Sequence, residues 1–164
     1  MKKFDGPSQA IFMCGISGSG KTHHAHRFER EGYVRLSVDD RIWKKAGDRL
    51  SDLTKEEQRQ LFAQCRAEVH DRLIELLKAG IKVVVDATHC KRSVRDEIRN
   101  LCAEVEITPL FAYCQADEEE LWRRLSQRKG NGPDDLIVTR GELSEYWQGF
   151  ERPQADESDF IILK

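Results

Sequence analysis

Residues 15–22 read GISGSGKT and match the pattern G-x-x-x-x-G-K-[ST] at every position. The apolar stretch Ala10–Cys14 precedes them and a helix-like segment follows, which is the context that this pattern requires. Glycine lets consecutive backbone N–H groups turn inward around a phosphate chain, and the N-terminus of the next helix adds partial positive charge. The sequence therefore predicts a strand–loop–helix unit that binds the phosphates of a nucleotide.

The residue types of this phosphate loop indicate separate roles. The ammonium group of Lys21 is expected to reach the β- and γ-phosphates, and the hydroxyl of Thr22 is expected to bind Mg²⁺. The alternative is a glycine-rich turn without a ligand, and the agreement of pattern and context argues against it. We therefore expect ATP as co-substrate and Mg²⁺ as cofactor. The other loop residues expected to bind ATP are Gly15, Ser17, Gly18, Ser19 and Gly20.

Strand-like and helix-like segments alternate along the chain, which is typical of an α/β fold with a mostly parallel sheet between helices. Three consecutive valines, residues 83–85, indicate a strand buried on both faces. Pro109 indicates that its strand is edge-like or irregular. The predicted strands cover residues 10–14, 33–37, 83–85, 105–111 and 160–163.

Capping and loop signals indicate where the helices begin and end. Thr54 and Glu57 form a capping-box pattern at the start of the longest helix, which Gly80 ends. The glycine-rich stretch that follows Lys129 is the clearest loop, and we expect a small lid near residues 129–135. The predicted helices cover residues 21–31, 41–44, 54–80, a segment around 94–101, 117–128 and 138–150.

Composition indicates one domain, residues 1–164, with one core. The formal net charge of −2 means that any basic binding surface must be local. No apolar run approaches the roughly 20 residues that span a bilayer, and the charged start is unlike a signal sequence. Five scattered cysteines without a C-x-x-C pair argue against zinc and disulfides. We expect a cytoplasmic protein with no membrane partner.

Carboxylates follow two predicted strands, and the strand ends should meet beside the phosphate loop. Asp39 is expected to accept the proton of an attacking hydroxyl, whereas Asp40 fits better as a helix cap or structural partner. Asp86 is expected to support Mg²⁺. The next residue is Ala87, so the position lacks the carboxylate that polarises water in ring-forming ATPases. The guanine-reading motifs N-K-x-D and T-K-x-D are also absent. These features favour transfer to a hydroxyl over hydrolysis of ATP or GTP.

Three further segments, residues 36–41, 84–89 and 150–153, together with the phosphate loop, resemble the polynucleotide kinase-like family of P-loop kinases. The resemblance extends over nearly the whole chain. It implies a P-loop kinase fold in which helices enclose the sheet and a small lid covers the nucleotide. The D-x-D-G-T motif of the phosphatase domain in the phage-type enzyme is absent, so we expect no phosphatase activity.

The resemblance also implies roles for individual residues. Asp39 corresponds to the general base of the family. Asp86 and Thr88 correspond to its second acidic strand and the polar turn after it. Arg128 corresponds to the lid arginine that contacts the nucleotide phosphates, with Arg124 nearby.

Basic residues are expected to bind the phosphates of an acceptor. The family usually places an arginine three residues after the base, but Ile42 occupies that position here and Arg41 precedes it. Arg92 and Arg95 share one face of a predicted helix beside the acceptor side and are expected to hold acceptor phosphates. The alternative for both is a solvated helix face balanced by neighbouring acids.

The sequence leaves three alternatives for the acceptor and the function. The resemblance and the local basic patches favour the 5′-hydroxyl of RNA or DNA. The acidic net charge and Ile42 favour a small molecule, such as a sugar, nucleoside or antibiotic. A third hypothesis is a nucleotide-binding regulatory module with negligible turnover.

Overall fold

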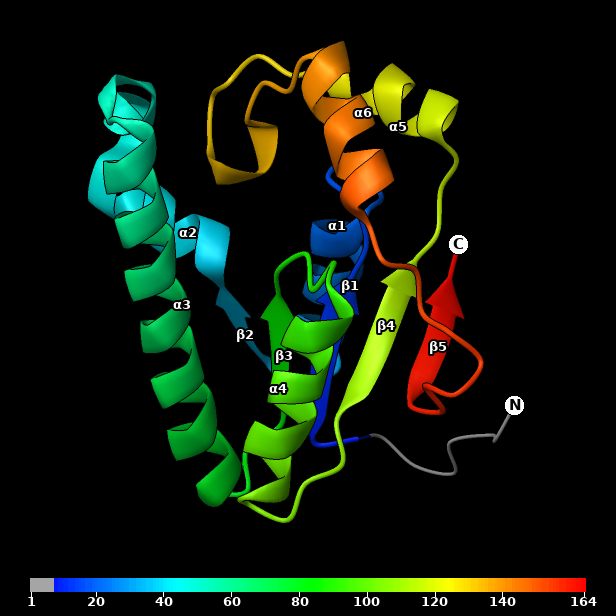
Figure 1. Ribbon diagram of the computed structural model, residues 1–164. Helices are drawn as coiled ribbons and strands as arrows, with labels where there is room; N and C mark the ends of the chain where they lie inside the picture. Colours follow the sequence, from blue (N-terminus) through cyan, green and yellow to red (C-terminus); the bar gives the residue numbers. More distant parts are fainter. Residues whose placement is uncertain (1–7) are drawn as a thin grey trace.

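The computed structural model describes residues 8–164, which form a parallel sheet enclosed by helices (Figure 1). The strand order is β2-β3-β1-β4-β5, and each neighbouring pair is parallel. This confirms the α/β fold expected from the alternation of strands and helices. The strands are β1 (Ala10–Cys14), β2 (Val34–Ser37), β3 (Val83–Asp86), β4 (Leu110–Cys114) and β5 (Phe160–Leu163).

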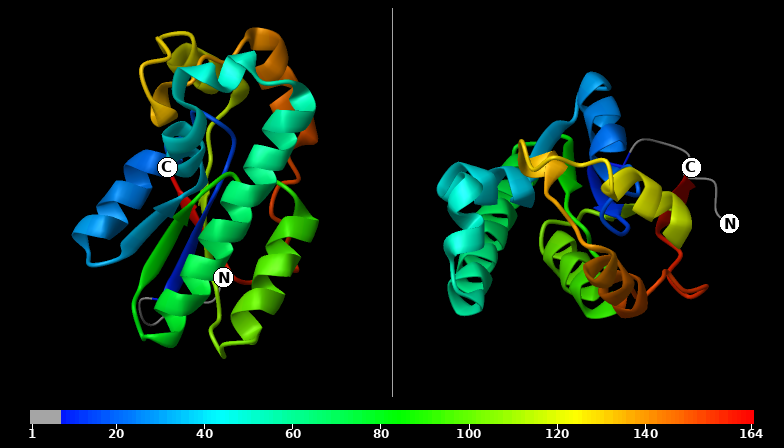
Figure 2. Two further views of the ribbon diagram at one scale, coloured as in Figure 1. Left: turned by 90° about the vertical axis from the view of Figure 1, so that its left-hand side faces the viewer. Right: turned by 90° about the horizontal axis from the view of Figure 1, so that it is seen from above.

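Helices cover both faces of the sheet (Figure 2). α1 (Lys21–Arg30) packs on one face, and α3 (Lys55–Lys78) and α4 (Arg92–Ala103) pack on the other. Side chains of β1 alternate between the two layers, with Phe12 in the α3 side of the core and Met13 in the α1 side. This burial on both faces explains why the central strands are continuously apolar.

The remaining helices lie above the carboxyl ends of the strands (Figure 1). On one side, α2 (Val38–Ala46) and the 3₁₀ helix η1 (Gly47–Asp52) adjoin the upper part of α3 and form an arm. On the other side, α5 (Glu118–Leu125) and α6 (Arg140–Gly149) pack together, with the lid helix η2 (Pro133–Asp135) between them in the chain. Within residues 8–164, no helix combines the length and apolar character that a membrane crossing needs.

Two helices begin with a capping box. The hydroxyl of Thr54 accepts a hydrogen bond from the backbone of Glu57, whose carboxylate accepts one in return from the backbone N–H of Thr54 at 2.8 Å. The same arrangement joins Thr139 and Glu142 at the start of α6, a signal that the sequence analysis did not single out. Each box supplies partners for helix N–H groups that would otherwise have none.

The structure corrects the expectation for β4. The strand begins at Leu110 and lies between β1 and β5, so it is not an edge strand. Pro109 precedes the strand, where its missing N–H costs no ladder hydrogen bond. Residues 105–107 instead close the end of α4, with Glu106 at a φ of 57°. The apolar alternation there belongs to a helix C-terminus and not to a strand.

Ion pairs fix the segment before β5 to α4. Arg95 donates to both carboxylate oxygens of Glu157 at 2.8 and 2.9 Å, and both side chains are fully buried. Arg99 joins Glu157 to Asp159 with bonds of 2.8 to 2.9 Å. Burial alone would raise the pKa of Glu157, but the hydrogen bonds from Arg95 and Arg99 hold that pKa at about 2. The carboxylate is therefore charged inside the fold.

Candidate active site

The phosphate loop between β1 and α1 has backbone conformations that favour glycine. Gly15 has a φ of 146° and Gly18 a φ of 85°, which L side chains rarely adopt. A Cβ on Gly15 would lie 2.6 Å from Ser19 Oγ and 2.8 Å from the carbonyl oxygen of Cys114. Within residues 8–164, the Ser19 hydroxyl is the buried side-chain group without a hydrogen-bond partner. Such an unpaired group fits a loop that receives a polar ligand.

Lys21 lies at the start of α1 with its ammonium group inside the loop. Its side chain is buried, and Nζ donates to the carbonyl oxygen of Ile16 at 2.9 Å. Burial lowers the pKa of Lys21, while the charges of Asp86 and Asp39 raise it. The charges of the two carboxylates that the sequence assigned to the acceptor and metal sides therefore act on this ammonium group.

Asp39 lies in the first turn of α2 and opens into the cleft between arm and lid. The helix begins earlier than expected because the Ser37 hydroxyl caps it, accepting a hydrogen bond from the N–H of Asp40 at 3.1 Å. Although Asp39 is exposed to the cleft, loss of hydration at its carboxylate raises its pKa to about 6. Lys21 opposes that rise and three neighbouring carboxylates add to it. Asp39 thus has the tuned pKa expected of a general base.

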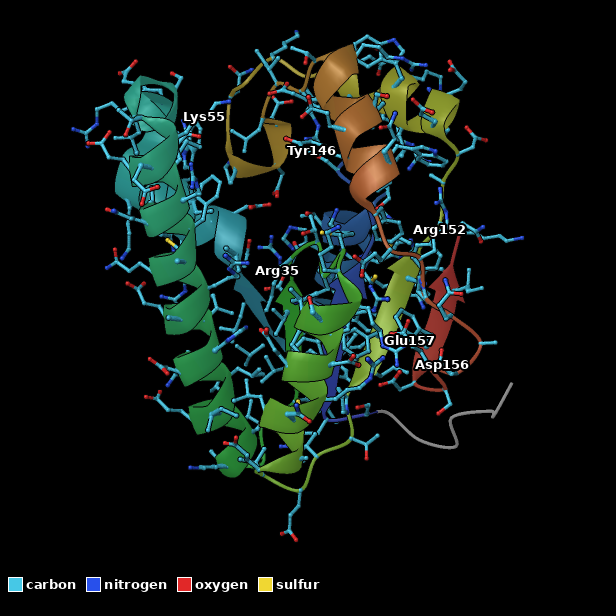
Figure 3. The ribbon with its side chains drawn as sticks, in the orientation of Figure 1. Arg35, Lys55, Tyr146, Arg152, Asp156 and Glu157 are labelled. Atoms are coloured by element: carbon cyan, nitrogen blue, oxygen red, sulfur yellow. The ribbon has the colours of Figure 1, made fainter. Side chains whose placement is uncertain are left out.

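Arg35 is a site residue that the sequence analysis missed (Figure 3). Its guanidinium group donates to Asp86 Oδ2 at 2.7 and 3.0 Å and to Asp40 Oδ2 at 2.8 Å. Its side chain is 8% exposed. The available signal was a charged residue inside a short apolar strand. Arg35 therefore orients the Asp86 carboxylate through Oδ2, and Asp86 Oδ1 takes no part in these hydrogen bonds.

Thr22 and Asp86 are the residues expected to hold Mg²⁺. The Thr22 hydroxyl donates to Asp134 of the lid at 3.3 Å, and Asp134 lies 4.0 Å from Arg35. Among residues 8–164, no group of three or more His, Cys, Asp or Glu forms a metal site by itself. Mg²⁺ usually takes one or two protein oxygens together with substrate phosphates and water. The donor set therefore fits Mg²⁺ that arrives with a nucleotide.

The structure brings both expected lid arginines to the phosphate loop. Arg124 Nη1 donates to the carbonyl oxygen of Gly18 at 3.1 Å. Arg128 Nη1 donates to Ser17 Oγ and to the carbonyl oxygen of Leu136, both at 3.3 Å. Because α5 ends before Arg128, this residue belongs to the lid loop and not to the helix.

Thr88 lies in the cleft as expected, but Arg41 does not line it. Arg41 pairs with Glu68 of α3 at 3.3 Å, and Lys45 binds the same carboxylate. Ile42 lines the cleft in its place and is 6% exposed. The position that carries an arginine in the resembling family therefore presents an aliphatic surface here.

The expected acceptor role of Arg92 and Arg95 is corrected by their positions. Arg95 is fully buried against Glu157. Arg92 binds Asp96 at 3.1 Å and Asp156 at 3.0 Å. Neither arginine lines the cleft. The shared helix face carries a structural ion network because the segment before β5 folds onto it.

A cleft of about 680 Å³ is lined by residues of the arm, the lid, α6 and the phosphate loop. Its polar lining includes Ser17 of the loop, Asp39 of α2, Thr88 after β3 and Arg128 of the lid. Tyr146 of α6 lines the lid side (Figure 3). The expected phosphate-binding groups and the expected base therefore line one cleft.

A protein family described as AAA domain matches residues 11–153. The chain belongs to this family. The AAA domain match runs from β1 to the segment after α6 and includes the phosphate loop, Asp39 and the lid. No curated protein sequence matches the chain.

Solved structures show which fold this AAA domain has. A gluconokinase from Sinorhizobium meliloti is 23% identical, with a TM-score of 0.64 over 93% of this chain and 80% of the other. A chain of the Pnkp1/Rnl/Hen1 RNA repair complex is 21% identical, with a TM-score of 0.70 over 91% of this chain and 46% of the other. The APS kinase of Mycobacterium tuberculosis, in complex with AMPPNP and APS, is 18% identical, with a TM-score of 0.55 over 96% and 90%. The fold is that of P-loop kinases.

Proposed function

We propose that the protein is an ATP-dependent kinase that transfers the γ-phosphoryl group to a hydroxyl of an acceptor bound in the cleft. The observation that carries this proposal is that Asp39, Ser17 and Arg128 line the same space. A base, a phosphate loop and a lid cation that face one cleft are the parts that phosphoryl transfer needs. The fold shared with kinases supports the proposal.

In this reaction Asp39 accepts the proton of the acceptor hydroxyl as the hydroxyl oxygen bonds to the γ-phosphorus. The bond from that phosphorus to the β,γ-bridging oxygen breaks, and ADP leaves. Lys21 and Arg128 offset the charge on the phosphoryl oxygens. Thr22 and Asp86 would hold Mg²⁺, which neutralises phosphate charge when it is bound. Positioning and electrostatics supply most of the acceleration.

The surroundings of the cleft favour a small molecule as the acceptor. A polynucleotide brings several phosphates, which basic side chains must neutralise. Carboxylates already hold Arg41 and Arg92, and Arg95 is buried. The 5′-hydroxyl of RNA or DNA is the alternative, and the fold shared with a chain of an RNA repair complex favours it.

The test is transfer of labelled γ-phosphate from ATP to small alcohols, sugars, nucleosides and 5′-hydroxyl oligonucleotides. Lys21→Ala and Asp39→Asn are the test variants, and Lys78→Ala and Asp71→Asn on exposed parts of α3 are their controls. Transfer that both test variants lose and both controls keep supports the proposal. Tight binding of ATP without transfer to any acceptor, unchanged in Asp39→Asn, contradicts it and favours the regulatory module.

A further inference from the structure

Apolar side chains form the two walls of the cleft beyond Asp39. Ile42, Trp43 and Phe62 line the arm side, and Ile137 and Tyr146 line the lid side. Ile137 is 67% exposed and Tyr146 is 46% exposed, although both are large apolar side chains. Apolar surface gathered around a cleft in this way is typical of a ligand-binding surface.

The charges that face the cleft do not favour an anion. Lys91 pairs with Glu151 at 3.2 Å, and Arg128 is directed to the phosphate loop. Arg66 and Glu145 also line the cleft, and neither has an ion-pair partner among residues 8–164. Besides Asp39, which the proposed reaction uses as its base, one positive and one negative group therefore remain, and these two carry no net charge that would attract an anion.

The hydrogen-bonding capacity of the walls is also small. Both N–H groups of the Gln58 side chain are used, donating to the carbonyl oxygens of Leu50 at 3.0 Å and Leu53 at 3.1 Å. The neutral polar groups that remain on the walls are the carbonyl oxygen of Gln58, the hydroxyls of Thr88 and Tyr146, the indole N–H of Trp43 and the weakly donating thiol of Cys90, while the Ser17 hydroxyl lies in the phosphate loop. A sugar or polyol loses water from every hydroxyl on entry, and apolar walls do not replace those hydrogen bonds.

We propose that the acceptor is an uncharged alcohol carried on an apolar, ring-sized body, and not a sugar, a polyol or a nucleic-acid end. This inference rests on the proposed kinase function of the same cleft. The hydroxyl reaches Asp39, while the body lies between Phe62 of α3 and Ile137, which follows the lid helix. A volume of about 680 Å³ holds such a body beside the γ-phosphate, because pockets of roughly 300–1,000 Å³ enclose drug-sized ligands.

Binding is measured first, by ligand-observed NMR on the full chain with Mg²⁺ and ADP. The probes share a primary hydroxyl: 3-phenylpropan-1-ol, its carboxylated form 4-(3-hydroxypropyl)benzoate, glucose, and a 5′-hydroxyl oligonucleotide. We expect the neutral aryl alcohol to bind at least about tenfold more tightly than each of the other three. Its apolar body gains from burial against the apolar walls, whereas the other probes also lose hydrogen bonds to water that the walls do not replace.

Two exposed isoleucines provide a matched pair of variants. Ile137→Ser removes an apolar side chain from the cleft, and Ile162→Ser removes one from β5, where the side chain is 55% exposed and lies outside the cleft. Neither side chain belongs to the core, so both variants should fold. We expect Ile137→Ser to weaken binding of the aryl alcohol about five- to tenfold and Ile162→Ser to leave it unchanged.

A second pair tests for an anionic acceptor. Arg66→Gln removes the cleft cation that is neither paired nor directed to the phosphate loop, and Arg59→Gln removes an exposed cation outside the cleft on the same helix. Neither change should alter binding of the neutral alcohol. Tighter binding of the carboxylate, glucose or oligonucleotide overturns the inference, as does an Ile137→Ser effect no larger than that of Ile162→Ser.

Transfer from labelled ATP is then measured with the same probes, which separates this inference from the proposed function. Binding of the aryl alcohol in the expected order without transfer to any probe keeps the inference and counts against the kinase. Transfer to glucose or to the oligonucleotide alone keeps the kinase and overturns the inference.

Discussion

Thr22 in α1 donates a hydrogen bond to Asp134 in the lid, with 3.3 Å between Oγ1 and Oδ1. Asp134 also lies 4.0 Å from Arg35, which binds Asp86. The lid therefore contacts the proposed metal-binding side of the nucleotide site through Asp134, as well as the phosphate side through Arg128. Both contacts involve one short segment of chain.

Asp134→Asn should weaken binding of ATP in the presence of Mg²⁺ by about tenfold, at the low end of the range for outer-shell partners of a metal. The amide keeps the shape of the side chain but removes the negative charge near Thr22. The measurement is the Kd of ATP with Mg²⁺ and with EDTA. Asp71→Asn, an exposed change on α3, is the control. An equal loss with EDTA would show that the charge of Asp134 acts independently of the metal.

Asp39→Asn should lower kcat by about 10²–10⁴-fold, the range for loss of a general base. The same variant should raise the Tm at pH 7 by about 1–3 °C, because it removes a charge that the folded state disfavours. Calorimetry and turnover measure the two effects on one preparation. A fall in both quantities would indicate that Asp39 has a structural role instead.

The pH dependence of turnover should follow Asp39. Its pKa of about 6 lies above the ordinary 3.8, so the carboxylate that accepts a proton is lost as pH falls through 6. We expect kcat/KM to fall about tenfold per pH unit below that point. The stability advantage of Asp39→Asn over wild type should be full above pH 6, shrink as pH falls through 6 and vanish below about pH 3, where Asp39 is neutral in both folded and unfolded chains. A rate profile that stays flat from pH 8 to 5 would exclude this assignment.

Arg128→Ala should lower kcat about 10²-fold and change the Kd of ATP much less, because its guanidinium group offsets charge that grows in the transition state. Arg123→Ala provides the control. Arg123 is exposed and binds Glu120 of its own helix. Steady-state kinetics of both variants are the measurement, and equal effects would mean that Arg128 only supports the lid.

Glu157→Gln should destabilise the fold by about 3 kcal/mol, because it leaves Arg95 charged and buried with a weakened partner. For a chain of this size the Tm should fall by about 6–12 °C. Asp156→Asn is the matched change, since Asp156 is 66% exposed and binds Arg92 at the surface. The measurement is the Tm of the two variants by thermal unfolding. If Glu157→Gln lowers the Tm as little as Asp156→Asn does, the buried pair is not needed for stability.

Local signals predicted much of the fold. The phosphate loop, the capping box at Thr54 and the apolar strand 83–85 each depend on neighbouring residues, and all three lie where the sequence indicated. The segment 105–111 was misread because its apolar alternation suits a helix end as well as a strand. Only the pairing of β4 with both β1 and β5 distinguishes the two.

The candidate site was harder to predict, because its side chains are organised by long-range pairing. Arg35 and Asp86 are 51 residues apart, and their contact follows from the parallel register of β2 with β3. Arg92 and Arg95 have a helical spacing that suits a binding face. Nothing local shows that the segment around Glu157 folds back to cover that face.

The pairing of Arg95 with Glu157 also affects how the chain is made. Glu157 follows Arg95 by 62 residues, so at about 5–20 residues per second a ribosome takes about 3–12 s to supply the partner. During that interval α4 has its buried cation but no carboxylate, and β4 lacks its neighbour β5. The nascent chain therefore exposes an unpaired strand edge until late in translation, which is when chaperones would protect it most effectively from aggregation.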